Sequence, residues 1–278
     1  MKGKDVINGL KDGEGKYFLS YAWDLSFSEL AINLDRDLSA EEEETFKRIL
    51  KDRAKGRPLQ YCLGKWDFYG RTFKVDERAL IPRPETERLV EEVLKRGIEG
   101  KILVDVGTGS GAIVLSLALE SLESGKMPEK LIGSDISGPA LDLARENEKL
   151  FFRDKMVQWT MGDLLEPIKQ KVDWIVSNPP YIDYAEKGNL QRELDYEPQE
   201  ALFAEERGLA VYRRLISQAA CRLKDGGRIG LEIGQDQARD ISAMLESQSF
   251  ENIEILKDYN NRDRMIFAEW KTRGGFCV

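Results

Sequence analysis

Lys101-Ile102-Leu103-Val104-Asp105-Val106-Gly107-Thr108-Gly109-Ser110-Gly111-Ala112 is the stretch of sequence that decides the fold. Its apolar first half predicts a buried strand, its glycines predict a turn, and the apolar residues 112–119 predict a helix. Glycines in that turn permit positive φ and let a ligand approach the backbone closely. The spacing Gly107-x-Gly109-x-x-Ala112 also satisfies the dinucleotide fingerprint, so the glycines alone do not identify the ligand.

Asp105 narrows the choice of ligand. It lies two residues before the first glycine. A carboxylate at this place opposes a pyrophosphate, whereas it suits a ligand that carries an ammonium or sulfonium group. Asp105 therefore favours a cationic cofactor, while an NAD-dependent oxidoreductase remains an alternative that the glycines allow.

Two further predicted strands also end in an acid. Residues 131–134 run into Asp135, which is placed to accept hydrogen bonds from both hydroxyls of a ribose. Residues 157–162 run into Asp163, where an adenine amino group could bind. The alternative for Asp163 is an N-cap or turn residue.

The tetrapeptide Asn178-Pro179-Pro180-Tyr181 follows the apolar run 174–177, a fourth predicted strand. Each residue before a proline is pushed towards extended backbone, so the turn is stiff. Such a turn can aim the Asn178 side-chain oxygen and the Pro179 carbonyl at the two N–H groups of one planar NH2. Tyr181 can cover the flat face of the same group. The alternative is an ordinary turn that ends a strand.

These four positions follow successive predicted strands, and ligands of open α/β sheets bind at the carboxyl ends of the strands. In this combination the sequence resembles the class I S-adenosylmethionine-dependent methyltransferases whose Asn-Pro-Pro-Tyr loop methylates an NH2 on planar carbon. Further motifs resemble the release-factor glutamine N5-methyltransferases of the HemK/PrmC type, and the resemblance runs from about Gly56 onward. These motifs are Gly56-Arg-Pro-Leu-Gln-Tyr61, Gly64-Lys-Trp-Asp-Phe-Tyr-Gly70, Ile81-Pro-Arg-Pro-Glu-Thr-Glu87, Glu197-Pro-Gln-Glu-Ala-Leu-Phe203, Gly208-Leu209 and Tyr212-Arg-Arg214.

The resemblance implies an α/β fold with a doubly wound, mostly parallel seven-stranded sheet. It also implies S-adenosylmethionine as cofactor, and the glutamine of the Gly-Gly-Gln loop in class I peptide release factors as substrate. The family often has an aromatic residue beside the adenine, where this chain has Leu164. The expected catalytic residues are Asn178, Pro179 and Tyr181. The expected substrate-binding residues are Asn178, Pro179, Pro180, Tyr181, Arg83 and Glu87. The expected cofactor-binding residues are Asp105, Gly107, Thr108, Gly109, Ser110, Gly111, Asp135, Asp163, Leu164 and Asn178.

Residues 81–87 have a second interpretation. Pro84 suits the first turn of a helix, and Glu85 and Glu87 suit its positive end, so the segment could simply begin a helix. That interpretation leaves Arg83 unexplained, whereas the family match places the segment beside the cofactor. We expect both roles together.

The chain of 278 residues is long enough for one α/β domain and a small additional one. We expect a helical substrate-binding domain over residues 1–65, in which Ser39 begins a helix with an acidic first turn. A β-hairpin connector around Gly70 is expected over residues 66–80, and the methyltransferase domain over 81–278. The last two apolar runs, 253–256 and 265–270, lack a helix between them, so one of them should run antiparallel. Residues 182–207 are interpreted as a substrate loop.

Composition excludes several kinds of chemistry. The chain contains no histidine, which rules out histidine-dependent triads, imidazole bases and histidine metal ligands. Cys62, Cys221 and Cys277 are isolated, so we expect no disulfide framework and no metal site. The net charge of -8 and the pI of about 5.0 weigh against a stable complex with nucleic acid. A basic run from Lys47 to Arg57 is interpreted as a solvated helix face.

The longest uncharged apolar stretch is too short to span a bilayer, and the first ten residues lack the apolar core of a signal peptide. We therefore expect a cytoplasmic protein with no membrane partner. We also expect a monomer.

Two alternative functions remain besides an NAD-dependent oxidoreductase. The Asn178 turn also fits the amino group of a nucleic-acid base, which a duplex would present only after base flipping. A non-catalytic module could bind S-adenosylmethionine without consuming it.

Overall fold

The computed structural model describes residues 1–258 and 260–272, and these divide into two units. The first unit contains residues 1–65 together with 191–196, and the second contains residues 66–190 with the remaining described residues. Cys277 lies outside the described residues. The expected division at 65, 80 and 81 stays a prediction. Within the described ranges, no helix combines the length with the apolar character that a bilayer-spanning segment requires.

The first unit is helical. It consists of α1 (Gly3–Gly9), η1 (Lys11–Gly13), α2 (Gly15–Trp23), α3 (Phe27–Asn33), α4 (Ala40–Ala54), α5 (Leu59–Leu63) and the short η3 (Arg192–Tyr196). The expected start at Ser39 is confirmed: its hydroxyl accepts from the Glu42 N–H at 3.2 Å, and the Glu42 carboxylate accepts from the Ser39 N–H at 2.7 Å. The core of this unit comprises Val6, Phe18, Leu19, Trp23, Leu30, Leu38, Phe46, Ile49 and Leu59.

Polar contacts from the end of α4 link residues 191–196 to the first unit. Arg53, near the end of α4, donates to Glu14 at 2.6 Å and to Glu193 at 3.3 Å. The Tyr196 hydroxyl adds a hydrogen bond to the Lys55 carbonyl at 3.2 Å. Arg53 and Lys55 of the basic run 47–57 thus contact residues 191–196, which are distant in sequence. The prediction that this run is a solvated helix face did not include these contacts.

The second unit begins with the expected hairpin, in which β1 (Lys65–Phe68) pairs with β2 (Arg71–Lys74). Its main sheet has seven strands in the order β10-β11-β9-β6-β3-β4-β5. These strands are β3 (Ile102–Val106), β4 (Lys130–Asp135), β5 (Val157–Met161), β6 (Val172–Ser177), β9 (Leu223–Glu232), β10 (Phe250–Lys257) and β11 (Asp263–Trp270). Within this described sheet, β11 alone runs in the opposite direction to the other strands, so its pairings with β10 and β9 are antiparallel. The predicted doubly wound sheet and its antiparallel ending are confirmed.

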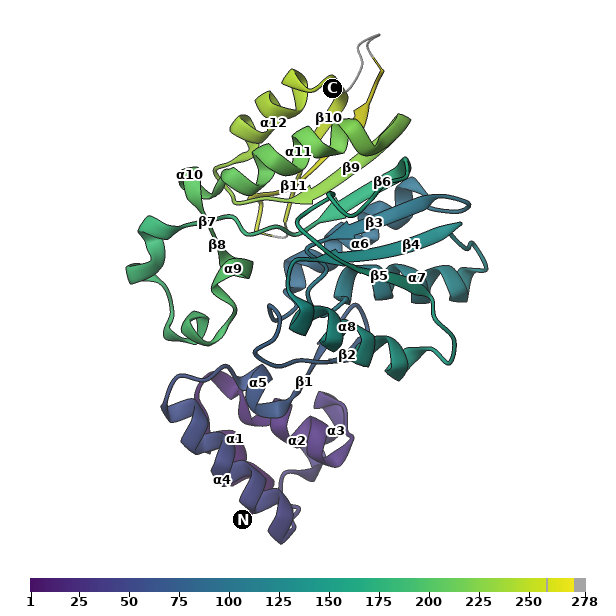
Figure 1. Ribbon diagram of the computed structural model, residues 1–278. Helices are drawn as coiled ribbons and strands as arrows, with labels where there is room; N and C mark the ends of the chain where they lie inside the picture. Colours follow the sequence, from purple (N-terminus) through teal and green to yellow (C-terminus); the bar gives the residue numbers. More distant parts are fainter. Residues whose placement is uncertain (259, 273–278) are drawn as a thin grey trace. The chain divides into compact units, whose positions relative to one another are not determined.

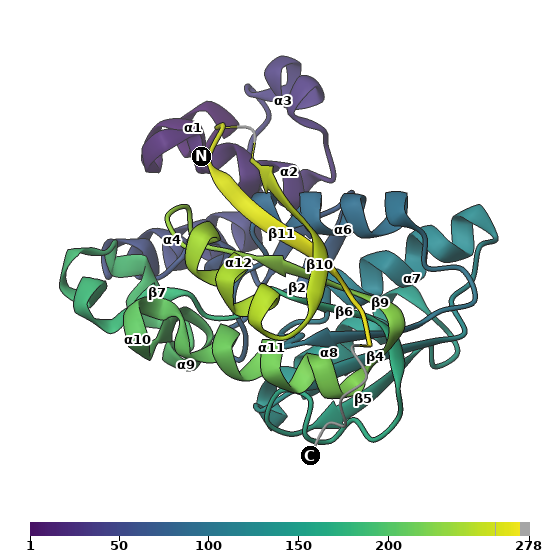
Figure 2. The same cartoon turned by 90° about the horizontal axis from the view of Figure 1, so that it is seen from above.

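Helices cover both faces of the sheet (Figures 1 and 2). On one face, α11 (Ala210–Arg222) and α12 (Ala238–Ser247) pack against residues such as Val104 and Ile175. On the other face, α6 (Pro84–Arg96) and α7 (Ala112–Ser124) pack against residues such as Leu103 and Val176. Alternate residues of a strand point to opposite faces, so each central strand contributes to both cores. The helix α8 (Gly138–Phe151) follows β4.

The order of the strands reverses at β3. The chain first adds β4 and β5 on one side of β3 and then returns to place β6 on its other side. The neighbours β3 and β6 are parallel, with Val106 opposite Ser177 in their register. The glycine-rich turn and the Asn178 turn therefore leave adjacent strands at the same edge, where ligands of such sheets bind. Between β6 and α11 lie short elements only. These are β7 (Ile182–Asp183), η2 (Tyr184–Asn189), η3 (Arg192–Tyr196), α9 (Gln199–Leu202), β8 (Phe203–Ala204) and α10 (Glu205–Gly208).

Candidate functional site

A pocket of about 270 Å³ lies at the carboxyl ends of β3, β4 and β6. Its size is close to the lower limit for pockets that hold small molecules and cofactors. The wall is formed by residues 78–83, Thr86, 106–110, 134–137, 162–164, Asn178, Pro180, 198, 200, 201, Arg214 and a few apolar side chains. It includes eight of the expected cofactor residues: Gly107, Thr108, Gly109, Ser110, Asp135, Asp163, Leu164 and Asn178. Asp105 and Gly111 lie outside this wall.

The glycine-rich turn is held by backbone hydrogen bonds. Gly107 and Gly111 have φ of 69° and 82°, in the left-handed region. The N–H groups of Gly107 and Thr108 both donate to the Ser134 carbonyl, at 2.8 and 3.0 Å. The turn is therefore preformed, and Gly111 serves as the N-cap of α7.

Asp105 lies beneath the turn and is fully buried. The Thr108 hydroxyl donates to its Oδ2 at 2.6 Å. Burial raises the pKa of Asp105 to about 7, against the opposing effects of the Thr108 hydroxyl and the Val114 N–H. A cation bound in the adjacent pocket would favour the ionised form of this acid.

Asp135 occupies the end of β4 and lines the pocket. Its Oδ2 accepts from the Gly109 N–H at 2.8 Å, and its Oδ1 accepts from the Ser137 N–H at 2.9 Å. Burial is the main cause that raises the pKa of this carboxyl. Each oxygen has a second lone pair, so the expected role towards two ribose hydroxyls is compatible with these contacts.

The third acid lies next to a cation that the sequence did not single out. Arg214 of α11 forms an ion pair with Asp163, and both residues line the pocket. Leu164 follows with φ of 50°, an unusual conformation for a bulky residue, and its carbonyl accepts from the Ser134 hydroxyl at 3.0 Å. Arg214 belongs to one of the family motifs, but nothing in its local pattern indicated this pairing.

Asn178 presents an unused acceptor at the pocket. Its Nδ2 donates to the Thr86 hydroxyl at 3.1 Å, whereas its buried Oδ1 has no hydrogen-bond partner in the described part of the chain. Buried polar atoms are rarely left without a partner, so this oxygen indicates a ligand donor. Pro180 lines the pocket, but Pro179 and Tyr181 lie outside its wall. Burial raises the pKa of Tyr181 to about 12, so its hydroxyl stays protonated.

Residues 81–87 begin a helix and also contribute Arg83 to the pocket wall; their contact with cofactor or substrate stays a prediction. Pro84 begins α6 with Glu85 and Glu87 in its first turn, as the simpler interpretation predicts. Arg83 lines the pocket and donates to Glu197 at 2.5 Å, and the same buried carboxylate accepts from the Ile81 N–H at 3.0 Å. Glu197 thus joins two motifs that are more than a hundred positions apart, and sequence reasoning assigned it no role. Glu87 lies outside the pocket wall and accepts from the Tyr69 N–H at 2.9 Å.

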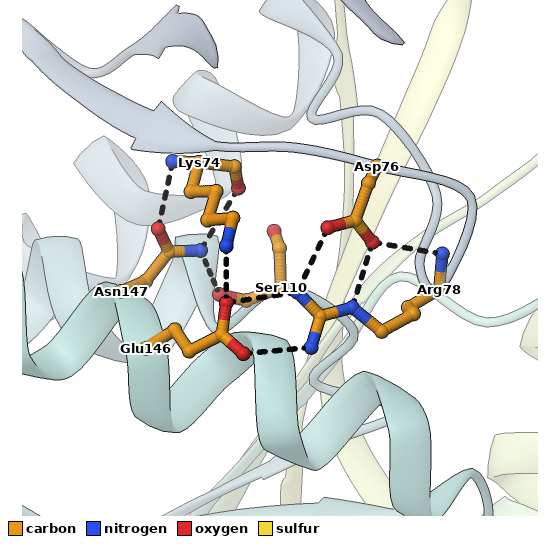
Figure 3. Close-up of polar contacts among 6 residues, drawn as sticks. All are labelled: Lys74, Asp76, Arg78, Ser110, Glu146 and Asn147. Atoms are coloured by element: carbon orange, nitrogen blue, oxygen red, sulfur yellow. Dashed lines mark hydrogen bonds and ion pairs between the residues drawn. The ribbon is translucent and has the colours of Figure 1, made fainter. Parts of the chain in front are cut away.

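A polar network anchors the strand that leads into this segment (Figure 3). Asn147 of α8 bonds to both backbone groups of Lys74 and donates to the Ser110 carbonyl at 2.9 Å. Arg78 lies between Asp76 and Glu146, at 2.8 Å from each. The hydrogen bond from Arg78 is the first cause that lowers the pKa of Glu146 to about 2. The network ties β2 and the pocket segment to the glycine-rich turn.

Two family models match successive parts of the chain. A family model described as the PrmC N-terminal domain matches residues 11–64, and the Methyltransferase small domain matches residues 84–261. A protein of Streptococcus pneumoniae named release factor glutamine methyltransferase is 40% identical over 268 residues, which cover 94% of each chain. A protein with the same name from Bacillus anthracis is 36% identical, again with 94% of each chain covered.

A third relative with that name, from Fusobacterium nucleatum, is 38% identical over 97% of this chain and 75% of its own. Among solved structures, a 16S rRNA N2 G1207 methyltransferase of T. thermophilus in complex with AdoMet and guanosine is similar. It is 20% identical, with a TM-score of 0.53, over 74% of this chain and 50% of that one. The likeness to this structure concerns the fold alone.

Proposed function

Because the chain belongs to the release factor glutamine methyltransferase family, we propose that it transfers a methyl group from S-adenosylmethionine to a release factor. The acceptor is the side-chain amide nitrogen, N5, of the glutamine in the Gly-Gly-Gln motif of class I peptide chain release factors. The names of the relatives favour this substrate over the amino group of a nucleic-acid base.

The observation that carries the proposal is the free Oδ1 of Asn178. It is buried at the wall of a pocket of cofactor size, and Asn178 directly follows β6, the strand next to β3 and its glycine-rich turn. An acceptor without a partner at this place suits a ligand that brings an N–H donor, and a primary carboxamide brings two.

The pocket wall supports most of the expected cofactor residues. We propose that the turn 107–111 contacts the methionine part of the cofactor, Asp135 the ribose, and Asp163 with Leu164 the adenine. Asp105 acts from beneath the turn, where its charge favours a cationic ligand. When bound, S-adenosylmethionine supplies an electrophilic methyl group on a sulfonium.

The protein must compensate for a weak nucleophile. The lone pair of an amide nitrogen is delocalised into the carbonyl, the resonance that gives a peptide bond a rotation barrier of about 18–20 kcal/mol. In the proposal, Asn178 Oδ1 and the Pro179 carbonyl each accept one N–H of the glutamine amide. These two bonds orient the nitrogen and stabilise the positive charge that develops on it. Tyr181 and the two prolines exclude water, and the proton leaves afterwards to solvent or a neighbouring acceptor.

The proposal extends to the rest of the chain. Residues 1–65 and the segment 182–207 would contact the body of the release factor, and Arg83 and Glu87 would support substrate binding. We further propose a cytoplasmic monomer without a stable nucleic-acid partner, for which the net charge of -8 is the supporting observation.

Mass spectrometry of a class I release factor incubated with the protein and S-adenosylmethionine tests this function. The expected product is one added methyl group on the Gly-Gly-Gln peptide, with stoichiometric S-adenosylhomocysteine. A release factor whose motif glutamine is replaced by alanine is the matched control and should stay unmodified. Methyl incorporation into ribosomal RNA or DNA instead of the release factor would overturn the proposal.

A further inference from the structure

Three buried or partly buried side chains from three elements form a line of hydrogen bonds that ends at the pocket. Glu232 is the last residue of β9, Thr86 is the third residue of α6, and Asn178 follows β6. The Thr86 hydroxyl donates to Glu232 Oε2 at 2.6 Å, and Asn178 Nδ2 donates to the Thr86 oxygen at 3.1 Å. In the parallel pairing of β6 with β9, Ser177 lies opposite Leu231, so Asn178 and Glu232 are the next positions along neighbouring strands.

The chemistry of these groups sets the direction of both hydrogen bonds. Burial raises the pKa of Glu232 to about 7, so the carboxyl is ionised above that pH. An ionised carboxylate only accepts, and a threonine hydroxyl has one hydrogen to donate. Once Thr86 donates to Glu232, its oxygen can only accept from Asn178. The amide of Asn178 must then turn its NH2 towards Thr86, which leaves Oδ1 facing away, as the structure shows.

The burial of Glu232 indicates more than a packing role. The residue is 1% exposed and Thr86 is 4% exposed. Burial raises the pKa of Glu232 to about 7, opposed by the Thr86 hydrogen bond and by Arg264. A buried carboxyl lowers the free energy of folding less than an apolar residue of similar size would.

Several other groups influence this carboxyl. Glu85 and Arg83 act on it from the start of α6, and Tyr181 and Tyr212 lie close enough to interact with its charge. The Tyr212 hydroxyl donates to the backbone carbonyl of Glu232 at 2.7 Å, so it leaves the carboxylate to Thr86.

The reverse orientation of the Asn178 amide would defeat its proposed role. The two orientations have nearly the same shape, so packing distinguishes them poorly. A reversed amide would direct its own N–H groups at the N–H groups of the substrate amide, and donors facing donors repel. The choice between the orientations must therefore come from the hydrogen-bond partners of Asn178.

We infer that Thr86 and Glu232 are positioning residues, which act through Asn178 by holding its amide oxygen towards the substrate NH2. The inference rests on the proposed methyl transfer. Glu232 lies outside the pocket wall, and Thr86, which lines the pocket, acts in this inference through Asn178. The inference gives the buried acid at the end of β9 a role.

Kinetics at saturating S-adenosylmethionine test the inference. Thr86→Val keeps the shape and removes the hydroxyl, so kcat should fall roughly 10-fold or more, the value of one hydrogen bond to a buried group. Thr86→Ser restores the hydroxyl and should recover most of this loss. Thr72→Val is the matched control, because the Thr72 hydroxyl also donates to a carboxylate, Asp67, at 2.7 Å but lies on the exposed hairpin. Its kcat should stay within about two-fold of the starting protein.

A double-mutant cycle separates positioning from general structural support. In an Asn178→Ala background, Thr86→Val should cost almost nothing further, because the amide that it orients is absent. An equal loss of kcat in both backgrounds would overturn the inference. Glu232→Leu is the second variant, with the same expected dependence on Asn178. Thermal unfolding of each variant verifies that the variant is folded at the temperature of the kinetic measurements.

A spectroscopic measurement decides the orientation without any turnover. In protein labelled with 15N-asparagine, the side-chain NH2 signal absent from Asn178→Ala identifies Asn178. Its protons should show slowed solvent exchange that Thr86→Val abolishes and Thr86→Ser retains. An unchanged signal in Thr86→Val would refute the inference. If the starting protein methylates no release factor, the proposed function falls, and this signal still decides whether Thr86 orients the amide.

Discussion

The glycine-rich turn after β3 and the Asn178 turn after β6 leave adjacent strands, yet they are built in different ways. The first turn is held by hydrogen bonds to its neighbour β4, within about 30 residues of sequence. The second depends on Thr86, which is 92 positions away from Asn178, and on Glu232, which is 146 positions away from Thr86.

This difference teaches how each side of the pocket is specified. In the proposed mechanism the cofactor side uses the backbone of the turn 107–111 and the carboxylates of Asp135 and Asp163, and positive φ at the glycines sets the course of that turn. On the substrate side the working atom belongs to a side-chain amide that can face either way. Local sequence suffices for the first arrangement, whereas the second requires partners from other elements.

Removing the working atom of the second turn should have the largest effect. Asn178→Ala should lower kcat on the order of 100-fold or more, the typical cost of losing one preorganised group at a developing charge. Single-turnover methyl transfer at saturating S-adenosylmethionine measures this loss. Near-normal turnover would show that the second turn is an ordinary strand ending and that the comparison of the two turns has no functional meaning.

The first turn should be sensitive to backbone changes instead. Gly107 and Gly125 have nearly equal φ, 69° and 70°, and an added methyl group would meet no atom within 4 Å at either place. Alanine at each position should therefore cost a similar free energy of unfolding, about 1–2 kcal/mol. Only Gly107 lines the pocket, so only Gly107→Ala should also weaken S-adenosylmethionine binding, by roughly 10-fold. Calorimetric titration and urea unfolding of both variants test this, and equal affinities would argue against a cofactor at this turn.

Each turn is underlain by a buried carboxyl, Asp105 or Glu232, and both should make stability depend on pH. Burial raises both pKa values to about 7, above the ordinary values of 3.8 and 4.5. The folded protein then keeps protons that the unfolded chain has lost. The contribution of these two groups to stability is thus greatest below about pH 4, falls as pH rises towards 7, and levels off above it, by at most about 1.4 kcal/mol per pH unit for each group.

Urea unfolding between pH 4 and 8 measures this dependence. Asp105→Asn and Glu232→Gln should each flatten part of the curve, because the replacement amides do not titrate. The informative quantity is the difference in slope between the starting protein and each variant. A slope that both variants leave unchanged, or make steeper in the falling direction, would contradict the assignment.

The smallest expected effect concerns the adenine side of the pocket. Leu164→Phe would place an aromatic ring at the position where the family often has one, and stacking contributes about 0.5–1.5 kcal/mol. We expect S-adenosylmethionine to bind roughly 2- to 10-fold more tightly, and Leu164→Ala to weaken binding. Parallel titrations with both variants check the sign. Weaker binding by both would mean that Leu164 is adapted to its unusual backbone and not to the adenine.

The sequence by itself determined the parallel sheet, its antiparallel ending, the hairpin at Gly70 and the helix that begins at Ser39. These features depend on periodicity, turn residues and caps, whose interactions lie within a few residues of one another. It also predicted that Asp105, Asp135, Asp163 and Asn178 lie at or near the carboxyl ends of successive strands, because strand ends are visible in the apolar pattern.

Only the tertiary structure decided which side chains meet at those ends. Arg214 beside Asp163, Glu197 beneath Arg83, and the line from Glu232 through Thr86 to Asn178 join segments that are distant in the chain. A buried acid and a helix-start threonine have no local signature that distinguishes orienting another side chain from ordinary packing. Their meaning arises when the sheet register and the packing of α6 bring them within hydrogen-bond distance, and that distance is a property of the folded chain alone.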